Sequence, residues 1–329
     1  MLIKMYNMKV FLFFLIVICS LGVSAESSKS YYLFVYFTGN NTSEQQICYA
    51  VSDNGFDFIP LNGGQPTIAS DTIAMMKAVR DPHLLRGNEG WFYMVATDMD
   101  WDKGKWSNHG IVMMRSKNLV HWEHHVVDFH KRFAGKKPAK VNAVWAPQTI
   151  WDSSACKYMV YFSLHSEEEG PYPQDAVYYA YANSDFSNLE TEPQLLFKYP
   201  FPTIDTDIVQ DKLGIYHLFF NTWGGKEGLI RRQYVFSEIH DQNKWILIDG
   251  RMQPNDINSE GSCVYPLVEG GWMLVYDCFK SGFCQFCRSS DLVNFELIKT
   301  TPTTGVFTPR HGTVILISKE EYDVLKNTF

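Results

Sequence analysis

Four segments of this sequence repeat one pattern, in which an anchor residue is followed twelve residues later by an apolar strand. The segments align on Asp81, Ala146, Asp205 and Glu260, and the strands begin at Tyr93, Tyr158, His217 and Trp272. Between these positions each segment has a short apolar stretch and then a turn. Self-similarity at a regular spacing is typical of repeat architectures, in which neighbouring units complete one another's core. The chain is therefore predicted to consist of equivalent β-hairpin units.

Further strands in most repeats extend each hairpin to four strands. Repeats of about 50 to 65 residues with four strands each are typical of propeller blades. Four blades begin near residues 81, 146, 205 and 260, and a fifth combines strand 313–318 with strands 31–37, 48–51 and 56–60. The sequence thus predicts an all-β fold, a five-bladed β-propeller over residues 26–329 whose last blade is closed by the N- and C-terminal strands. A two-layer β-sandwich is the alternative.

Residues 1–25 have the pattern of a secretory signal peptide. Two lysines precede an apolar run over residues 10–21, and Val23-Ser24-Ala25 offers small residues at the cleavage positions. We therefore expect an exported protein, either periplasmic or extracellular. No second long apolar segment follows, so membrane insertion is not expected.

The composition narrows the classes of partner. The formal net charge is −7, which gives no basic stripe for nucleic acid, so no nucleic-acid partner is expected. Aromatic residues make up 15% of the chain, and their flat faces favour both strands and contact with sugar rings. We therefore expect an oligo- or polysaccharide as the partner. We also expect the protein to be a monomer.

Propeller symmetry turns the anchor residues into a candidate site. The first strand of every blade lines the axis, and these strands run in the same direction. Asp81, Asp205 and Glu260 should therefore meet at one mouth of the central channel, beside Arg310 or His311 of the fifth blade. An aspartate before a turn is often only a turn residue. Three such acids in one funnel repel one another, which predicts a raised pKa for at least one of them.

The motifs around these positions resemble glycoside hydrolase family 43. They occur in the family's order and cover the whole predicted domain: Arg80-Asp81-Pro82, Trp145-Ala146-Pro147, Ile204-Asp205, Glu260-Gly261 and Arg310-His311-Gly312. The resemblance implies an inverting hydrolase of arabinose- or xylose-containing glycans. It also implies that Asp81 is the general base, that Glu260 is the general acid, and that Asp205 orients the acid and tunes its pKa.

Inverting hydrolysis is consistent with three acids in one pocket. One ionised carboxylate activates water, one protonated carboxyl protonates the leaving oxygen, and a further carboxylate near the acid can keep it protonated. Trp145 and Arg310 are the expected substrate contacts. An α-L-arabinofuranosidase is favoured, with a β-xylosidase, a galactan-directed hydrolase or a non-catalytic glycan-binding propeller as alternatives. A retaining fructosidase-type enzyme needs an Asn-Asp-Pro nucleophile, which the N-terminal segment lacks.

Several residues carry a second interpretation. Gln148 stands where the family often has an acid, and Asp207 is expected deeper in the channel than Asp205. No cofactor is required for the chemistry, but the resemblance implies that His311 could help to hold a structural calcium in the central channel. Calcium prefers oxygen ligands, so a hydrogen-bonded core histidine is the alternative. The remaining candidates are three possible sugar platforms and one weak metal or redox motif: Trp101, Trp106 and Trp223, and Cys284 with Cys287.

Overall fold

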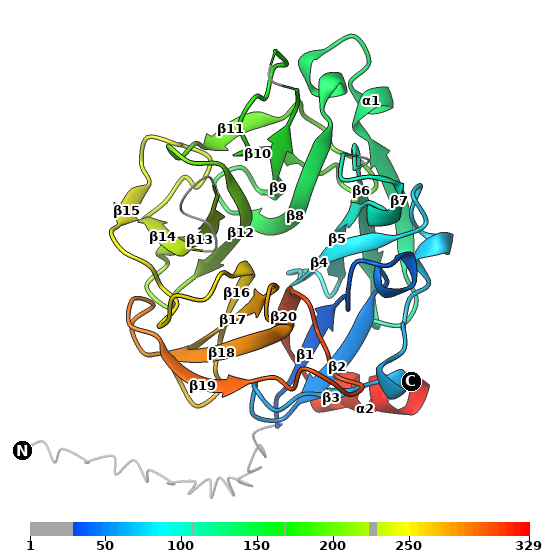
Figure 1. Ribbon diagram of the computed structural model, residues 1–329, viewed down its shortest axis with the longest axis vertical. Helices are drawn as coiled ribbons and strands as arrows, with labels where there is room; N and C mark the ends of the chain where they lie inside the picture. Colours follow the sequence, from blue (N-terminus) through cyan, green and yellow to red (C-terminus); the bar gives the residue numbers. More distant parts are fainter. Residues whose placement is uncertain (1–28, 107, 168, 224–228) are drawn as a thin grey trace, which may run out of the picture.

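The computed structural model describes residues 29–106, 108–167, 169–223 and 229–329, and the predicted signal peptide therefore lies outside the described residues. The strands of the described part form five antiparallel sheets of four strands, arranged around a central axis (Figure 1). The prediction of a five-bladed β-propeller is confirmed, and the β-sandwich alternative is wrong.

Each sheet is one blade, and in blades 1 to 4 the strands follow the chain outward from the axis. Blade 1 consists of β4 (Val79–Arg86), β5 (Phe92–Asp98), β6 (Gly110–Ser116) and β7 (Glu123–Asp128). Blade 2 consists of β8 (Ala143–Asp152), β9 (Lys157–His165), β10 (Ala176–Tyr181) and β11 (Gln194–Phe197). Blade 3 consists of β12 (Thr203–Gln210), β13 (Tyr216–Thr222), β14 (Leu229–Val235) and β15 (Ile246–Ile248). Blade 4 consists of β16 (Glu260–Pro266), β17 (Trp272–Cys278), β18 (Phe283–Ser289) and β19 (Glu296–Thr300).

The fifth blade joins the two ends of the described chain, as predicted. Its sheet order is β20 (Gly312–Ile317), β1 (Tyr31–Tyr36), β2 (Cys48–Ser52) and β3 (Ile59–Pro60). β20 pairs with β1 from Tyr31↔Ile317 to Tyr36↔Gly312. Pairing the first described strand with the last removes two free edges and closes the ring.

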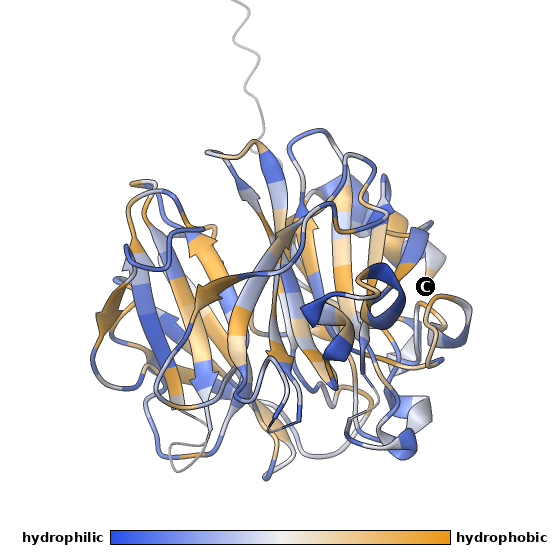
Figure 2. Cartoon of the chain, turned by 90° about the horizontal axis from the view of Figure 1, so that it is seen from above, coloured by the Kyte–Doolittle hydropathy of each residue, from blue (hydrophilic) through white to orange (hydrophobic). Residues whose placement is uncertain are grey.

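The hydrophobic core is divided into layers between adjacent blades. On β5, Tyr93 and Val95 belong to the cluster shared with blade 2, whereas Met94 and Ala96 belong to the cluster shared with blade 5. Successive side chains of a strand point to opposite faces, so a strand between two blades must be apolar on both. Figure 2 shows the resulting hydropathy, with apolar strands inside and more polar loops at their ends.

Short helices occur only between or after strands in the described part of the chain. They are η1 (Thr42–Glu44), η2 (Asn62–Gly64), η3 (Ser70–Thr72), η4 (Trp101–Lys103), α1 (Phe129–Arg132), η5 (Lys137–Lys140) and α2 (Lys319–Thr328). The helix α2 begins with a capping box formed by Ser318 and Glu321, and it buries Leu325 against the cluster between blades 5 and 1. None of these helices is long and apolar enough to cross a membrane.

Candidate active site

The inner strands of blades 1 to 4 carry the same irregularity at the channel mouth. The pairing of the first with the second strand shifts register there, and a residue with positive φ lies at the shift. The residues are Asp81 (φ 53°), Ala146 (41°), Asp205 (51°) and Gly261 (61°). A positive φ costs a residue with a side chain about 1 to 3 kcal/mol, and such strain is concentrated at functional sites.

The fourth bulge corrects the alignment of the sequence repeats, because Gly261 occupies the position expected for Glu260. Glu260 pairs with Asp277 before the shift, just as Arg80 pairs with Thr97 in blade 1. A side chain at Gly261 is excluded, since its Cβ would lie 1.9 Å from Cγ of His311. Glu260 is therefore equivalent to Arg80 and not to Asp81. The twelve-residue spacing is kept in blade 4 because the start of the second strand is displaced by one residue as well: Trp272 is equivalent to Phe92 and not to Tyr93.

With this correction the five inner strands supply three successive rings of residues along the channel. The mouth ring contains Arg80, Trp145, Ile204, Glu260 and Arg310. The acid ring contains Asp81, Ala146, Asp205, Gly261 and His311, which together line a cavity of about 10 Å³ on the axis. The latch ring, two residues further on, contains His83, Gln148, Asp207, Cys263 and Thr313. All members of the acid ring are buried, whereas all members of the mouth ring except Arg80 are partly exposed.

Asp81 is held between two hydrogen-bond donors. Nε2 of His311 donates to Oδ1 over 2.7 Å, and the hydroxyl of Thr97 donates to Oδ2 over 2.7 Å. Burial disfavours the charged carboxylate, but the hydrogen bond and charge of His311, together with Arg80 and Thr97, lower the pKa of Asp81 to about 2. Asp81 is thus ionised at any ordinary pH and fixed in orientation, which is the state a general base needs.

Glu260 lies on the other side of the same imidazole. Its Oε1 is 4.0 Å from Nδ1 of His311 and accepts a hydrogen bond from Nη2 of Arg310. Nε of Arg310 donates to Oδ2 of Asp277. Burial is the largest influence and raises the pKa of Glu260, with the charge of Asp277 acting in the same direction against His311 and Arg310. A protonated Glu260 can serve as a general acid.

His311 separates the two carboxylates and is itself charged. Nδ1 lies 3.6 Å from Oδ2 of Asp277, while Nε2 contacts Asp81. Burial opposes protonation, yet Asp277 and Asp81 outweigh it and raise the pKa of His311 to about 10. The imidazolium therefore orients Asp81 and offsets part of the negative charge in the site.

Asp205 is the third predicted acid, and it reaches across to the next blade. Its Oδ2 accepts a hydrogen bond from the backbone N–H of Gly261 over 2.9 Å. Burial raises the pKa of Asp205, and the charges of Glu260 and Asp81 raise it further against the effect of His311. The expected upward shift among crowded acids is thus present at Asp205 and at Glu260.

Three cationic groups surround one phenyl ring beside these acids. The guanidinium carbons of Arg80 and Arg310 lie 4.6 and 5.4 Å from the ring centroid of Phe37, and the His311 ring contacts it edge-on at 5.1 Å. Asn40 accepts hydrogen bonds from both arginines, over 2.8 and 3.1 Å. Cation–π contacts and the shared amide hold the two arginines together despite their like charge.

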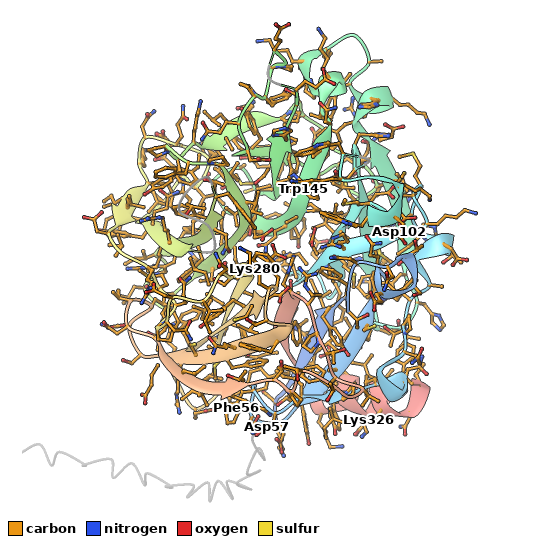
Figure 3. All side chains as sticks on the ribbon, viewed as in Figure 1. Phe56, Asp57, Asp102, Trp145, Lys280 and Lys326 are labelled. Atoms are coloured by element: carbon orange, nitrogen blue, oxygen red, sulfur yellow. The ribbon has the colours of Figure 1, made fainter. Side chains whose placement is uncertain are left out.

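Aromatic side chains of blades 1 and 2 form a wall at the acid-bearing mouth. Trp145 lies near the centre of the disc in Figure 3, with its ring 6.2 Å from that of Trp106. Trp106 is 45% exposed and stacks on His165 at 4.4 Å. Trp101 lies over Arg80 at 5.6 Å. Trp223 packs against Phe279 at 5.7 Å, so its ring is engaged in a packing contact.

Residues of the latch ring form hydrogen bonds between neighbouring blades. Asp207 has this role directly, and Gln148 has it through Tyr161. Oδ2 of Asp207 accepts a hydrogen bond from the N–H of Val264 in blade 4 over 2.6 Å. Gln148 accepts one from the hydroxyl of Tyr161, which in turn accepts the N–H of Ile208 in blade 3. Asp207 is therefore deeper in the channel than Asp205, as expected, and Gln148 contributes to blade contacts.

Asp207 should make stability depend on pH. Burial raises the pKa of Asp207 to about 7, whereas an unfolded aspartate titrates near about 3.9. The unfolded chain therefore releases this proton first, and the carboxyl destabilises the fold increasingly as pH rises from about 4 to about 7. Asp207→Asn removes the titration and keeps an acceptor for Val264. We expect its melting temperature relative to the native protein to rise between pH 4 and 8; an unchanged difference would contradict the assignment.

The surroundings of His311 do not fit a metal ion bound directly by its imidazole. Glu260, Asp277 and His311 do lie close enough to share an ion. However, Nε2 of His311 is bonded to Asp81, a protonated ring has no lone pair to give, and Arg310 already bridges Glu260 and Asp277. A structural calcium elsewhere in the central channel stays a prediction.

Chelation provides the test of this metal expectation. Because Arg310 and His311 already supply positive charge between the carboxylates, we expect EDTA to leave both the melting temperature and the hydrolysis rate unchanged. Elemental analysis of the purified protein, with a calcium-reconstituted sample as the reference, completes the measurement. A lower melting temperature that calcium restores would assign the channel to a metal.

The Cys284–Cys287 motif has a structural role. The two thiols are buried on β18, where Cys284 donates to the carbonyl of Pro309 and Cys287 contacts the hydroxyl of Tyr276. Every described cysteine is a free thiol. Within the described residues, no group of metal ligands includes a cysteine.

Sequence reasoning missed Thr97, Asp277 and Asn40. Thr97 and Asp277 occupy equivalent places, because they pair with Arg80 and Glu260 at the ends of the second strands of their blades. A polar residue ending an otherwise apolar strand was the available signal. Asn40 lies in a connection between strands, where no repeat marks its position.

Comparison with known proteins agrees with this fold. A family model described as "Probable glycosyl hydrolase domain", related to glycosyl hydrolase family 43, matches residues 28–323. The chain therefore belongs to this family of glycosyl hydrolase domains. Its similarity to an alpha-L-arabinofuranosidase of Bifidobacterium longum subsp. longum is 26% identity over 220 residues, 60% of this chain. The matched part is only 20% of that longer relative.

Solved structures show the same fold at low sequence identity. An endo-1,4-beta-xylanase from Bacteroides thetaiotaomicron superposes with a TM-score of 0.57 at 12% identity, covering 86% of this chain and 93% of that one. A thermostable family-43 glycoside hydrolase gives 0.51 at 19% identity, covering 71% and 76%. An endo-arabinase from Bacteroides thetaiotaomicron gives 0.51 at 14% identity, covering 70% and 84%.

Proposed function

We propose that this protein hydrolyses glycosidic bonds with inversion of configuration, and that α-L-arabinofuranosides are its substrates. The observation that carries the proposal is the placement of Asp81 and Glu260 on opposite sides of the single His311 ring, 2.7 and 4.0 Å from its two nitrogens. This arrangement is consistent with the separation of about 6.5 to 9.5 Å between the two carboxyl groups of inverting hydrolases, which leaves room for a water molecule between base and sugar.

Each residue has a distinct part in the proposed reaction. Asp81 accepts a proton from water as the water attacks the anomeric carbon, and Glu260 gives its proton to the leaving oxygen. His311 is a positioning residue that keeps Asp81 ionised and aligned. Trp145 and Arg310, in the mouth ring, are the proposed substrate contacts.

The preference for arabinofuranosides rests on the similarity to the B. longum alpha-L-arabinofuranosidase. Nitrophenyl α-L-arabinofuranoside, β-D-xyloside and β-D-galactoside measured side by side test it, and we expect the arabinofuranoside to have the highest kcat/KM. Proton NMR during early turnover should show a product of opposite anomeric configuration. Retention of configuration would overturn the mechanism, and a higher kcat/KM for the xyloside or galactoside would change the substrate.

Asp205 is proposed to keep Glu260 protonated. The charge of Glu260 raises the pKa of Asp205, and such a coupling is mutual, so replacing Asp205 by asparagine should lower the pKa of Glu260. The basic limb of the pH–rate profile should then move to lower pH, and the rate should decrease by about 10² or more. A lower rate with an unchanged basic limb would mean that Asp205 acts only structurally, through its hydrogen bond with the N–H of Gly261.

Export is proposed on the pattern of residues 1–25. N-terminal sequencing of the exported protein should give a chain beginning near Glu26. A mature chain that still begins with Met1 would contradict the proposal.

A further inference from the structure

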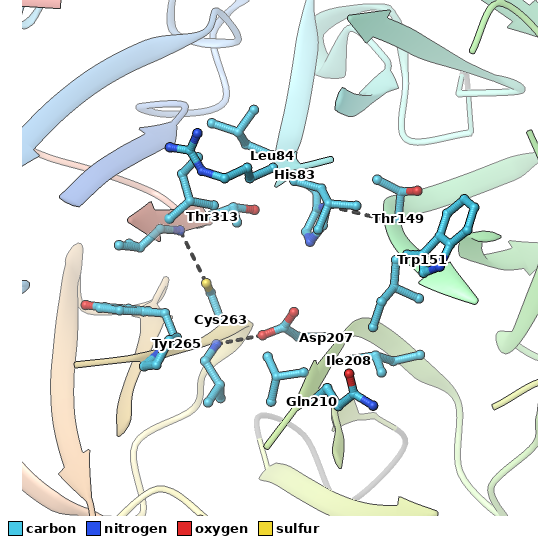
Figure 4. Close-up of a pocket in the computed structure, with 18 of the residues that line it drawn as sticks. His83, Leu84, Thr149, Trp151, Asp207, Ile208, Gln210, Cys263, Tyr265 and Thr313 are labelled. Carbon is cyan, nitrogen blue, oxygen red and sulfur yellow. Dashed lines mark hydrogen bonds between the residues drawn. The ribbon is translucent and has the colours of Figure 1, made fainter. Parts of the chain in front are cut away.

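The opposite mouth of the central channel opens into a second, much larger cavity, shown in Figure 4. Its volume is about 620 Å³, within the range of about 300 to 1,000 Å³ that is usual for small-molecule sites. Four residues of the latch ring, His83, Asp207, Cys263 and Thr313, form its floor, and the parts of the five inner strands that follow them form its walls. None of the proposed hydrolytic chemistry uses it.

The lining of this cavity is more apolar than polar, and aromatic side chains such as Trp151 and Trp272 contribute to it together with aliphatic ones. The apolar side chains that line it come from all five blades: Leu84, Ile150, Ile208, Val264 and Val314. A sugar would leave several hydroxyl groups against these side chains without hydrogen-bond partners, at a cost of about 1 to 3 kcal/mol each. The walls therefore favour a ligand with an apolar body over a second glycan.

One polar group of the floor, His83, is neutral. It is 6% exposed, and its Nδ1 accepts a hydrogen bond from the backbone N–H of Thr149 over 3.3 Å. The proton is therefore on Nε2, for which the described residues provide no acceptor. Burial lowers the pKa of His83 to about 3, so the imidazole supplies no positive charge to attract an anion.

Asp207 is the acid of the floor. It is 3% exposed, and its carboxyl group points into the channel in Figure 4. The N–H of Val264 is its only hydrogen-bond donor among the described residues, although a carboxylate can accept about four hydrogen bonds. A buried carboxylate with one partner lacks a counter-charge. Arg86, at the rim, donates its hydrogen bonds to Glu321 and to the carbonyl of Leu316, and therefore does not supply the counter-charge of Asp207.

We propose that this cavity is a binding site for small organic cations, in which a primary ammonium group pairs with Asp207 and an apolar body contacts the apolar walls. The site is separate from the acid-bearing mouth and does not depend on the proposed hydrolytic function. The ammonium group supplies both the missing charge and the missing hydrogen-bond donors of the carboxylate.

Calorimetric titration with benzylamine and with benzyl alcohol tests the site, because the two probes share a ring and differ in charge. At about pH 8 we expect benzylamine to bind at least about tenfold more tightly, a difference of about 1.4 kcal/mol. Asp207→Asn should remove the preference, and Asp53→Asn, at an exposed aspartate, should keep it. Equal affinities for the two probes, or an amine preference that survives Asp207→Asn, would overturn the proposal.

A second measurement uses the unaltered protein, in case Asp207→Asn does not fold. Among the groups that face Asp207, His83 stays neutral because burial lowers its pKa, and the hydroxyl of Tyr161 and the thiol of Cys263 stay protonated because burial raises theirs. Asp207, with a pKa of about 7, is thus the group of the cavity that ionises between pH 6 and 8. Benzylamine affinity should rise over this range.

The same pH dependence should persist in Asp205→Asn, because Asp205 belongs to the other mouth. A pH-independent affinity would overturn the proposal. So would benzylamine binding that disappears in Asp205→Asn, since the amine would then occupy the acid-bearing mouth.

Discussion

Replacing Asp81 by asparagine is expected to abolish hydrolysis, with a loss of about 10² to 10⁴ in kcat, the usual contribution of a general base. Water attack is required whatever the leaving group, so nitrophenyl and natural sugar substrates should lose rate alike. Asparagine has nearly the same shape and can still accept from Thr97, which leaves the lost charge as the main change. Steady-state kinetics on both substrate types provides the measurement.

The matched control for this variant is Asp53→Asn, since Asp53 is an exposed aspartate that forms an ion pair with Lys29. Its rate should equal that of the native protein. The ion pair between Asp81 and His311 is lost as well, so circular dichroism and the melting temperature of Asp81→Asn must show that the fold persists. Near-native turnover in a folded Asp81→Asn would mean that another group activates the water.

Replacing Glu260 by glutamine is expected to lower the hydrolysis rate by an amount that depends on the leaving group. A poor leaving group such as a sugar needs the proton of Glu260, so its hydrolysis should slow by about 10² to 10⁴. An activated phenolate departs without a proton and should lose much less. Because the pKa of Glu260 is raised, the native rate should fall as pH rises through that pKa, and the variant should lose this basic limb.

Glu296→Gln is the corresponding control, because Glu296 is exposed on β19 of the same blade as Glu260. It should keep both the rate and the pH profile. Equal losses for phenolate and sugar leaving groups in Glu260→Gln would indicate that Glu260 binds substrate without transferring a proton. In that case Asp205, whose pKa is also raised, becomes the candidate acid.

The architecture could be predicted because its causes are local and repeated. Strands such as β5 are apolar on both faces since each blade packs between two others, and four copies of this pattern indicated the ring. The terminal closure followed from counting strands. The helix α2 was missed although Ser318 and Glu321 form a capping box, because a single ten-residue helix adds little periodic signal.

The site was predicted less completely, and the misplacement of Glu260 shows why. A bulge is a backbone feature, and the sequence spacing stayed at twelve residues in blade 4 because both the anchor and the start of the second strand were aligned one residue too early. Only the strand pairing shows that Gly261 holds the bulge and that Glu260 belongs to the mouth ring with Arg80.

The sequence by itself determined the blade number, the closure of the ring, and the identity of Asp81, Asp205, Glu260, Arg310 and His311 as residues of one mouth. Only the tertiary structure decided their charges and partners. Asp81 is ionised because His311, 230 residues away in the chain, donates to it, while Asp205 and Glu260 resist ionisation because folding buries them. Protonation depends on distance and solvent exposure across blades, which no local pattern of residues encodes.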